Sequence, residues 1–143
     1  ESIDCYFKQH ISVPSQALLI ENQSLETRLR NMLTKVAQMV CDPTLPGGCL
    51  FVLSLSETAG QYLPEQIVSE VNARFDSYTA SLLEFFENEQ GLGNISNKSS
   101  AKVLMGYIIS LQLGIANMGR SGVKKDDIYD VIEHSLLSFD FNK

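Results

Sequence analysis

Positive charge is scarce in this sequence. Its 143 residues contain 11 Lys and Arg against 17 Asp and Glu, which gives a formal net charge of −6 and a pI near 4.8. Non-specific binding to nucleic acids depends on a positive field that attracts phosphates. We therefore do not expect this chain to bind DNA or RNA by itself.

Long hydrophobic runs are also missing. The longest apolar stretch, from Val103 to Met118, is interrupted by glycines and polar side chains. It falls short of the roughly 20 residues that a helix needs to cross a bilayer. The composition, with 44% hydrophobic and 20% charged residues, is typical of a globular domain rather than a disordered segment. The sequence predicts a soluble protein with no membrane partner.

Cysteines are few, and their number is odd. Cys5, Cys41 and Cys49 in a chain of this length indicate reduced thiols in a reducing compartment rather than a disulfide framework. The acidic start, Glu1 to Asp4, lacks the basic region of a signal peptide. A cytoplasmic location is therefore expected. The missing initiator Met indicates a fragment or a processed chain.

Clusters of residues that could catalyse a reaction or hold a metal are absent from the sequence pattern. His10 and His134 lie near opposite ends of the chain, and the sequence neighbours of a helical histidine point in other directions. Cys41 and Cys49 have no histidine nearby, whereas metal sites need ligands at close spacing. A partly exposed histidine and free thiols that pack as small apolar groups are favoured. We assign no catalytic residue, no metal ligand and no cofactor.

Helical periodicity is what the sequence does contain. Apolar residues repeat at steps of three and four through segment 24–41, where Ser24 is a candidate N-cap. The same kind of pattern, bounded by Pro or Gly, predicts helices over 64–90, 99–118 and 125–140.

Two further segments complete the predicted architecture. The short apolar run after the Pro/Gly turn at 43–48 could be a helix or a buried strand by its pattern alone. A helix over 49–59 is favoured, because no second segment of comparable β character could pair with a strand there. Residues 1–10 could be the end of another helix. The sequence thus predicts an all-α fold, a single domain over 1–143 built as an antiparallel bundle of five to six helices.

Large side chains, several with polar tips, gather on the inward faces of the predicted helices. Apolar walls with a few phenol and amide groups are typical of a small-molecule pocket. The same residues would also describe a filled core, and the periodicity leaves both possibilities open. The candidate ligand-binding residues are Met32, Met39, Phe51, Leu55, Phe75, Tyr78, Leu82, Tyr107 and Leu111, with Gln112 beside them.

Segment 99–118 is apolar on nearly every side, which predicts burial on every side. One such helix can be central in a single chain, and alternatively a partner chain can cover its outer face. Gly106, Ser110 and Gly114 form a flat strip where another backbone could approach. Segments 99–118 and 125–140 of one chain would together form half of a four-helix bundle, and a second copy of the chain would supply the other half. The candidate dimer-interface residues are Leu104, Ile108, Gly114, Ile115, Ile128, Ile132 and Leu136.

The order of these motifs resembles a known family. Pro46-Gly47-Gly48-Cys49-Leu50, followed by Glu57, is similar to the Gly-Cys-Leu box and trailing Glu in the C-terminal regulatory domain of tetracycline-repressor (TetR) family transcription factors. The end of the long helix at 89–91, the 101–115 stretch with its internal glycine and the start of the last helix at 122–127 follow the family pattern.

The resemblance implies a regulatory domain that dimerises through 99–118 and 125–140 and binds a small apolar or amphipathic effector. Family members carry an N-terminal helix-turn-helix before this region. It is missing here, so DNA would be bound only through that missing part, and 1–10 resembles the connecting helix. An effector would tilt this helix and change the separation of the two DNA-reading heads. The family has no fixed pocket motif, so no ligand contact carries over.

Three other interpretations stay open. A secreted helical-bundle signalling protein would make the glycosylation acceptor patterns at Asn22, Asn94 and Asn97 real, and it would need disulfides. A small helical enzyme or cofactor carrier would need a polar cluster in the core. A helical dimerisation module without a ligand differs from the regulator hypothesis only in lacking a cavity.

Overall fold

The computed structural model describes residues 15–42 and 64–142. Its elements are a short 3-10 helix and four α-helices: η2 (Gln16–Leu19), α3 (Leu25–Val40), α5 (Glu65–Gly91), α6 (Ala101–Arg120) and α7 (Lys125–Leu136). No β-strand occurs within these two ranges, and the prediction of an all-α fold is confirmed there. The helices predicted over 1–10 and 49–59, with the strand alternative for the latter, lie outside the described residues.

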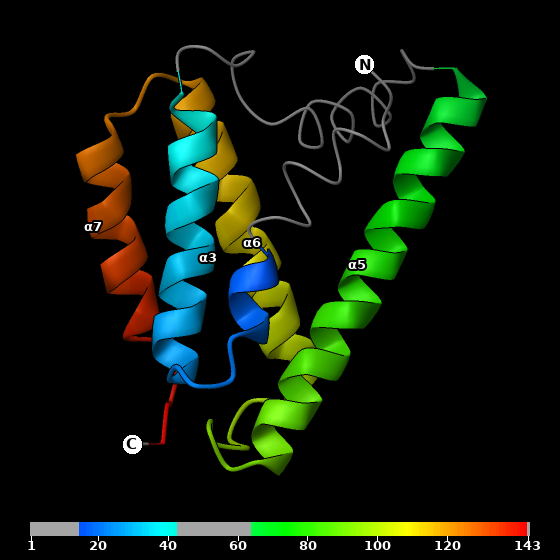
Figure 1. The fold of residues 1–143 in the computed structure, drawn as a ribbon. Helices are drawn as coiled ribbons and strands as arrows, with labels where there is room; N and C mark the ends of the chain where they lie inside the picture. The colour runs from blue at the N-terminus through cyan, green and yellow to red at the C-terminus, as the bar shows by residue number, and fades with distance from the viewer. Residues whose placement is uncertain (1–14, 43–63, 143) are drawn as a thin grey trace.

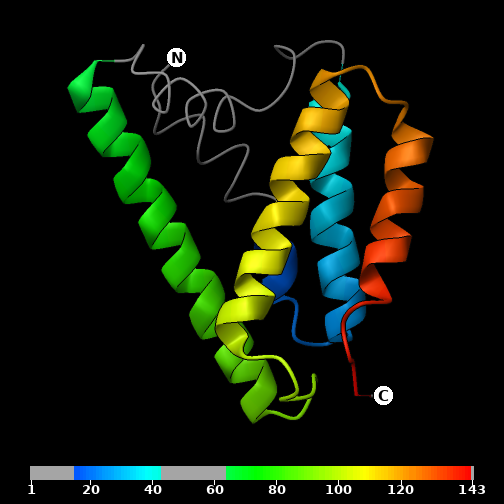
Figure 2. The same cartoon turned by 180° about the vertical axis from the view of Figure 1, so that it is seen from behind.

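The helices α3, α6 and α7 lie side by side, whereas α5 meets α6 near one end and diverges from it toward the other (Figures 1 and 2). The helices α5 and α6 run in opposite directions, as do α6 and α7 (Figure 1). The helix η2 packs on α3. The lower part of α5, where it meets α6, is therefore held in the same body as the other helices.

Serine caps set the starts of two helices. Ser24 Oγ accepts a hydrogen bond from Thr27 N at 3.2 Å, as its predicted N-cap role requires. Ser100 Oγ accepts one from Val103 N at 3.2 Å, so α6 begins at Ala101 rather than at residue 99. The helix continues to Arg120, and Gly122 then adopts a φ of +85°, a left-handed conformation that glycine allows without strain.

The last helix is shorter than predicted. The sequence pattern indicated a helix over 125–140, but α7 ends at Leu136. Beyond it the chain pairs with the α5–α6 connection, where Ser96 N donates to Asp140 O at 2.9 Å and Asn142 N donates to Asn94 O at 3.1 Å. These backbone bonds replace the helical ones, so the predicted end was wrong.

The core surrounds α3. Leu29, Met32, Leu33 and Ala37 are each fully buried, and α3 contacts α6, α7 and η2. Apolar side chains from the other helices complete this core: Leu82 and Phe86 from α5, Leu104, Ile108 and Ile115 from α6, and Ile128, Ile132 and Leu136 from α7.

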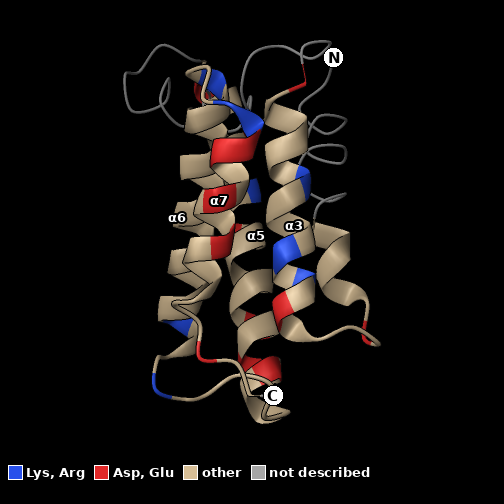
Figure 3. Cartoon of the chain, turned by 90° about the vertical axis from the view of Figure 1, so that its left-hand side faces the viewer, with Lys and Arg blue, Asp and Glu red and all other residues tan. Residues whose placement is uncertain are grey.

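An exposed ion pair joins α3 to α7 at the surface. Arg30 Nε donates to Glu133 Oε2 at 2.7 Å, and this bond raises the pKa of the Arg30 guanidinium. Figure 3 shows the basic groups of α3 beside the acidic groups of α7.

The helix α6 is not buried on every side. It contacts α3, α5 and α7, which leaves a fourth side open. Val103 is 60% exposed, and the strip of Gly106, Ser110 and Gly114 is exposed as well. The prediction of burial on every side was therefore wrong for the single chain.

Among the described helices, α6 alone has the length and apolar composition that would also suit a membrane span. It has 20 residues, the same length as the predicted 99–118 helix, and lies two residues further along the chain. The same composition is typical of the central helix of a bundle, and α6 packs against three neighbours here.

Candidate functional site

Three helices and the residue before η2 bring polar groups together inside the bundle. Tyr78 of α5 donates its hydroxyl hydrogen to Gln112 Oε1 of α6 at 2.8 Å. Gln112 Nε2 in turn lies 3.9 Å from Met32 Sδ of α3. The Tyr78 hydroxyl also makes a hydrogen bond with Ser15. We call Ser15, Met32, Tyr78 and Gln112 the inner polar strip.

The inner polar strip is uncharged at neutral pH. Burial raises the pKa of the Tyr78 phenol above its ordinary value, and the hydrogen bonds to Ser15 and Gln112 only partly oppose this effect. The phenol therefore stays protonated and acts as a donor. Neutral donors and acceptors set in apolar walls are the chemistry that orients a small molecule.

Most of the described ligand-binding candidates lie in or near this strip. Met32 and Leu82 are buried, and Phe75 is partly buried on the same helix as Tyr78. Met39 is partly buried further along α3. Phe51 and Leu55, the two candidates in the 49–59 segment, lie outside the described residues.

Two candidates lie on a different side of α6. The Tyr107 hydroxyl donates to Ser138 Oγ at 3.2 Å, and its ring centroid is 5.3 Å from that of Phe139. Leu111 follows one turn later and shares this side. The Tyr107 side chain faces the end of α7, not the inner polar strip. Because this helix is apolar on nearly every side, its sequence pattern does not show which side chains face α5. Gln112, about 100° beyond Leu111 around the helix, is one that does.

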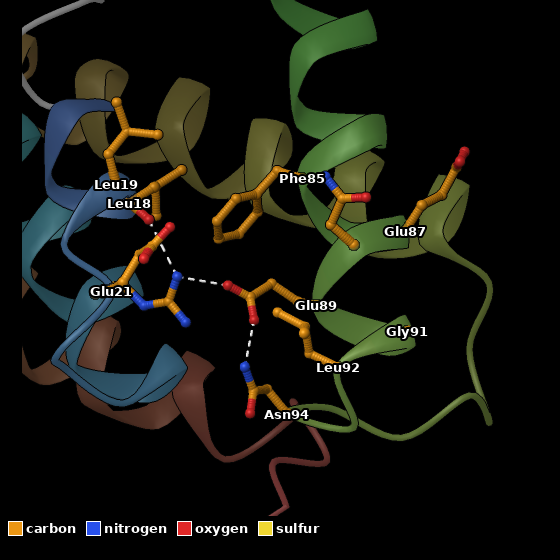
Figure 4. A pocket seen from close by; sticks show the side chains of 11 residues that line it. Leu18, Leu19, Glu21, Phe85, Glu87, Glu89, Gly91, Leu92 and Asn94 are labelled. Carbon is orange, nitrogen blue, oxygen red and sulfur yellow. Dashed lines mark hydrogen bonds and ion pairs between the residues drawn. The ribbon is translucent and has the colours of Figure 1, made fainter.

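The sequence analysis missed a surface cleft at the C-terminal end of α5 (Figure 4). Its volume is about 680 Å³, and η2, the start of α3 and the end of α5 surround it. We call it the Arg28 cleft. Its lining residues are Leu18, Leu19, Glu21, Arg28, Phe85, Glu87, Asn88, Glu89, Gly91, Leu92 and Asn94.

A buried ion pair lies in the wall of the Arg28 cleft. Arg28 Nη1 lies 2.5 Å from Glu89 Oε1, and the two side chains are only 7% and 5% exposed. The same Nη1 donates to the Leu18 carbonyl at 3.1 Å, while Glu89 Oε2 accepts from Asn94 Nδ2. The guanidinium carbon is 5.8 Å from the centroid of the Phe85 ring, within the range of a cation–π contact. Arg28 thereby joins η2, α3 and α5.

One signal for this pair was present in the sequence. Glu89 continues the apolar stripe of the 64–90 helix, in register with Phe85. A carboxylate at such a position needs a buried partner. The sequence analysis predicted no partner for Glu89, because nothing in the local pattern shows that Arg28, a charged residue, is only 6% exposed.

The dimer-interface candidates lie almost entirely inside the single chain. Only Gly114 is exposed. The other six are between 0% and 7% exposed and contact the chain's own core: Leu104, Ile108, Ile115, Ile128, Ile132 and Leu136. A second copy could therefore contact their exposed neighbours, such as Val103 and Val131, but not these side chains.

The remaining chemistry-bearing residues stay separate. In 15–42 and 64–142, no group of three or more His, Cys, Asp or Glu could hold a metal ion. Cys41 is a free, partly buried thiol, and His134 is exposed on α7. Cys5, His10 and Cys49 lie outside the described residues.

Comparison with known proteins gives a match in fold. No protein-family model matches the sequence, and neither does any curated protein. Two solved structures of cysteine mutants of the TetR family transcriptional regulator CifR, both with 26-base-pair double-strand operator DNA, match with TM-scores of 0.73 and 0.72 at 15% identity. The matches cover 96% and 95% of this chain and 70% of each regulator chain.

This chain has the fold of a TetR family regulator. The resemblance inferred from the order of sequence motifs is thus supported at the level of the fold. The Gly-Cys-Leu box at 46–57 lies outside the described residues. The long α5, the apolar α6 and the final α7 follow one another as the motif order indicated.

Proposed function

We propose that this chain is the small-molecule-sensing and dimerisation domain of a TetR-like transcriptional regulator. The proposal rests on one observation: the match in fold, over nearly the whole chain, to a regulator solved with operator DNA. With a net charge of −6, this chain lacks the positive field that DNA binding requires. DNA would be read by a helix-turn-helix outside residues 1–143, and the regulator would act in the cytoplasm.

The inner polar strip supports the sensing part of the proposal. It brings a phenol and an amide from two helices into a largely apolar interior, next to the Met32 thioether. Such a site suits a small apolar or amphipathic effector that needs a few polar contacts for orientation. An effector that separated Tyr78 from Gln112 would also change how α5 packs on α6.

The open side of α6 supports the dimerisation part. Between Lys102 and Arg120, α6 carries no charged side chain (Figure 3). The contact between Tyr107 and Ser138 sets the register of the antiparallel α6 and α7, so Val131, which is 40% exposed, lies about level with Gly114. We call Val103, Gly106, Ser110, Gly114 and Val131 the outer α6–α7 face. Small residues along it let a second backbone approach closely.

A route for the signal follows from two hydrogen bonds. Tyr78 contacts Ser15 at the start of η2, and Arg28 holds the Leu18 carbonyl at its end. A shift of α5 relative to α3 would therefore move η2 and the residues before it. In the intact regulator this movement would change the separation of the DNA-reading heads.

Native mass spectrometry of the chain as purified from cells tests the proposal. We expect a species at twice the 15.9 kDa of one chain, with part of it carrying an extra small-molecule mass. A dimer that never carries or takes up a small molecule would favour a dimerisation module without a ligand. A species that stays monomeric at micromolar concentration would contradict the proposal.

A further inference from the structure

We propose that residues 138–142 are a strap that controls how firmly η2 is held. We call them the C-terminal strap. The control runs through Asn94, Glu89 and Arg28, none of which belongs to the strap itself. This inference goes beyond the proposed function, which gives these last residues no role, and it depends neither on effector binding nor on dimerisation.

The C-terminal strap is bonded to the connection between α5 and α6. Ser96 N donates to Asp140 O at 2.9 Å, and Asn142 N donates to Asn94 O at 3.1 Å. The Asn142 side chain adds a third bond, because its Nδ2 donates to the Gly93 carbonyl at 2.6 Å. Both bonds of Asn142 therefore hold the chain just beyond the last turn of α5.

Asn94 links this anchorage to the buried ion pair, as the dashed lines in Figure 4 show. Its side chain donates to Glu89 Oε2, and the other carboxylate oxygen of Glu89 contacts Arg28 Nη1. The same Nη1 donates to the Leu18 carbonyl of η2 at 3.1 Å. In a buried network of this kind, the strength of each bond depends on the geometry of its neighbours. Strap bonds that fix Asn94 therefore also steady Arg28 and η2.

The outer part of the strap can detach while the bundle stays folded. Asp140 and Asn142 are exposed, so water can replace their hydrogen bonds. Phe141 between them is only partly buried, whereas Phe139 is buried in the core and keeps the start of the strap attached. Segments with few buried contacts open locally at a smaller cost in free energy than the whole fold. A partner that displaced the outer part of the strap would thus loosen η2 without touching it.

The Nε hydrogen of Arg28 reports on this relay. Arg28 Nε is buried, so its hydrogen exchanges with water only when the surrounding structure opens. Arg74 Nε is also buried, but it lies in the first half of α5, away from the residues that the strap contacts. NMR exchange spectra of the isotope-labelled 143-residue chain therefore contain both the reporter and an internal control.

The variant Asn142→Pro tests the strap. Proline has neither an N–H nor an amide side chain, so this one change removes both bonds of Asn142. We expect the Arg28 Nε hydrogen to exchange about tenfold faster, with the Arg74 rate unchanged. The backbone of residues 16–19 should also become more mobile in nitrogen relaxation measurements. Leu137→Ala, which shortens an exposed side chain just before the strap, is the matched control and should change neither rate.

The variant Asn94→Ala tests the path between the strap and the ion pair. It removes the side-chain bond to Glu89 and leaves the contact between Glu89 and Arg28 in place. Because the strap acts through the Asn94 side chain, its effect should disappear once that link is gone. We expect Asn142→Pro to change the Arg28 rate by less than about twofold in the Asn94→Ala chain.

Four results would overturn the inference: an Arg28 rate that Asn142→Pro leaves unchanged, an equal acceleration at Arg74, an equal effect of Leu137→Ala, or an undiminished effect of Asn142→Pro in the Asn94→Ala chain. Each of them would leave the proposed function standing, since none measures dimerisation or effector binding. Conversely, a monomeric or ligand-free native mass spectrum would leave the role of the strap untouched.

Discussion

At the scale of single residues, the buried pair of Arg28 and Glu89 carries the largest consequence. Both charges are removed from water, so each depends on the other for its stabilisation. The pair also has further partners, because Arg28 holds the Leu18 carbonyl and Asn94 donates to Glu89. Loss of one partner should therefore cost more than loss of both.

We expect Arg28→Met to destabilise the chain by about 3–5 kcal/mol, because Glu89 would stay buried without a counter-charge. The double variant Arg28→Met with Glu89→Met should recover most of that loss, since it removes both charges. Urea denaturation monitored by circular dichroism measures the two free energies of unfolding.

Arg30→Met provides the control for this comparison. Arg30 and Glu133 are 35% and 56% exposed, so loss of this pair should cost less than about 1 kcal/mol. The interpretation of Arg28 would be contradicted if Arg28→Met cost no more than Arg30→Met, or if the double variant were less stable than the single one.

The same residues show how far sequence patterns reach at this scale. Periodicity located Met32 and Tyr78 correctly as inward-facing, because each lies on a clear apolar stripe. It gave no prediction for Arg28, since whether a long charged side chain is buried depends on a partner 61 positions away at Glu89. It could not show that Tyr107 faces Ser138 and Phe139, because α6 is apolar on too many sides to show which one faces α5.

At the scale of elements, every helix boundary except the end of α7 was predicted to within two residues. The starts depend on local chemistry, such as the Ser24 cap, and they lie close to the predicted positions. The end of α7 depends on backbone bonds to residues 94–96, which no local pattern records. Phe139 is buried although it lies beyond the helix.

The contact between the ends of α3 and α6 gives a prediction at this scale. A β-carbon at Gly119 would overlap Val40 Cγ2 and would lie 3.0 Å from Val40 Cβ. Because a valine side chain has little freedom to move aside, we expect Gly119→Ala to destabilise the chain by about 1–3 kcal/mol. Thermal or urea unfolding measures this loss.

Gly91→Ala is the matched control, since a β-carbon there meets nothing within 4 Å. It should be neutral, or stabilising by up to about 1 kcal/mol, because alanine favours the helix. Equal stability of the two alanine variants would show that α3 and α6 do not approach as closely as described.

At the scale of the whole molecule, the order of motifs was more informative than any one of them. It pointed to a TetR-like fold, which the match to solved regulators supports. The sequence could not separate interface residues from core residues, because an apolar stripe looks the same whether it packs on its own chain or on a partner. The six large side chains proved to be core, and the outer α6–α7 face had to be recognised from exposure.

The central claim is that two copies of the chain dimerise through the outer α6–α7 face. Its most direct test is the mass in solution of two arginine variants, measured by light scattering after size-exclusion chromatography. Ser110 lies on the outer α6–α7 face, and Ser81 is an equally helical, exposed serine on α5. The Ser110 and Ser81 hydroxyls each donate to the backbone carbonyl four residues earlier, at 2.8 Å and 3.0 Å respectively. Each substitution therefore removes one hydrogen bond of the same kind.

At micromolar concentration, we expect the unaltered chain and Ser81→Arg to be dimers. Ser110→Arg should be a monomer, because a buried arginine without a partner would separate the two faces. A Ser110→Arg chain as dimeric as the unaltered one, or an unaltered chain that is already monomeric, would contradict the account.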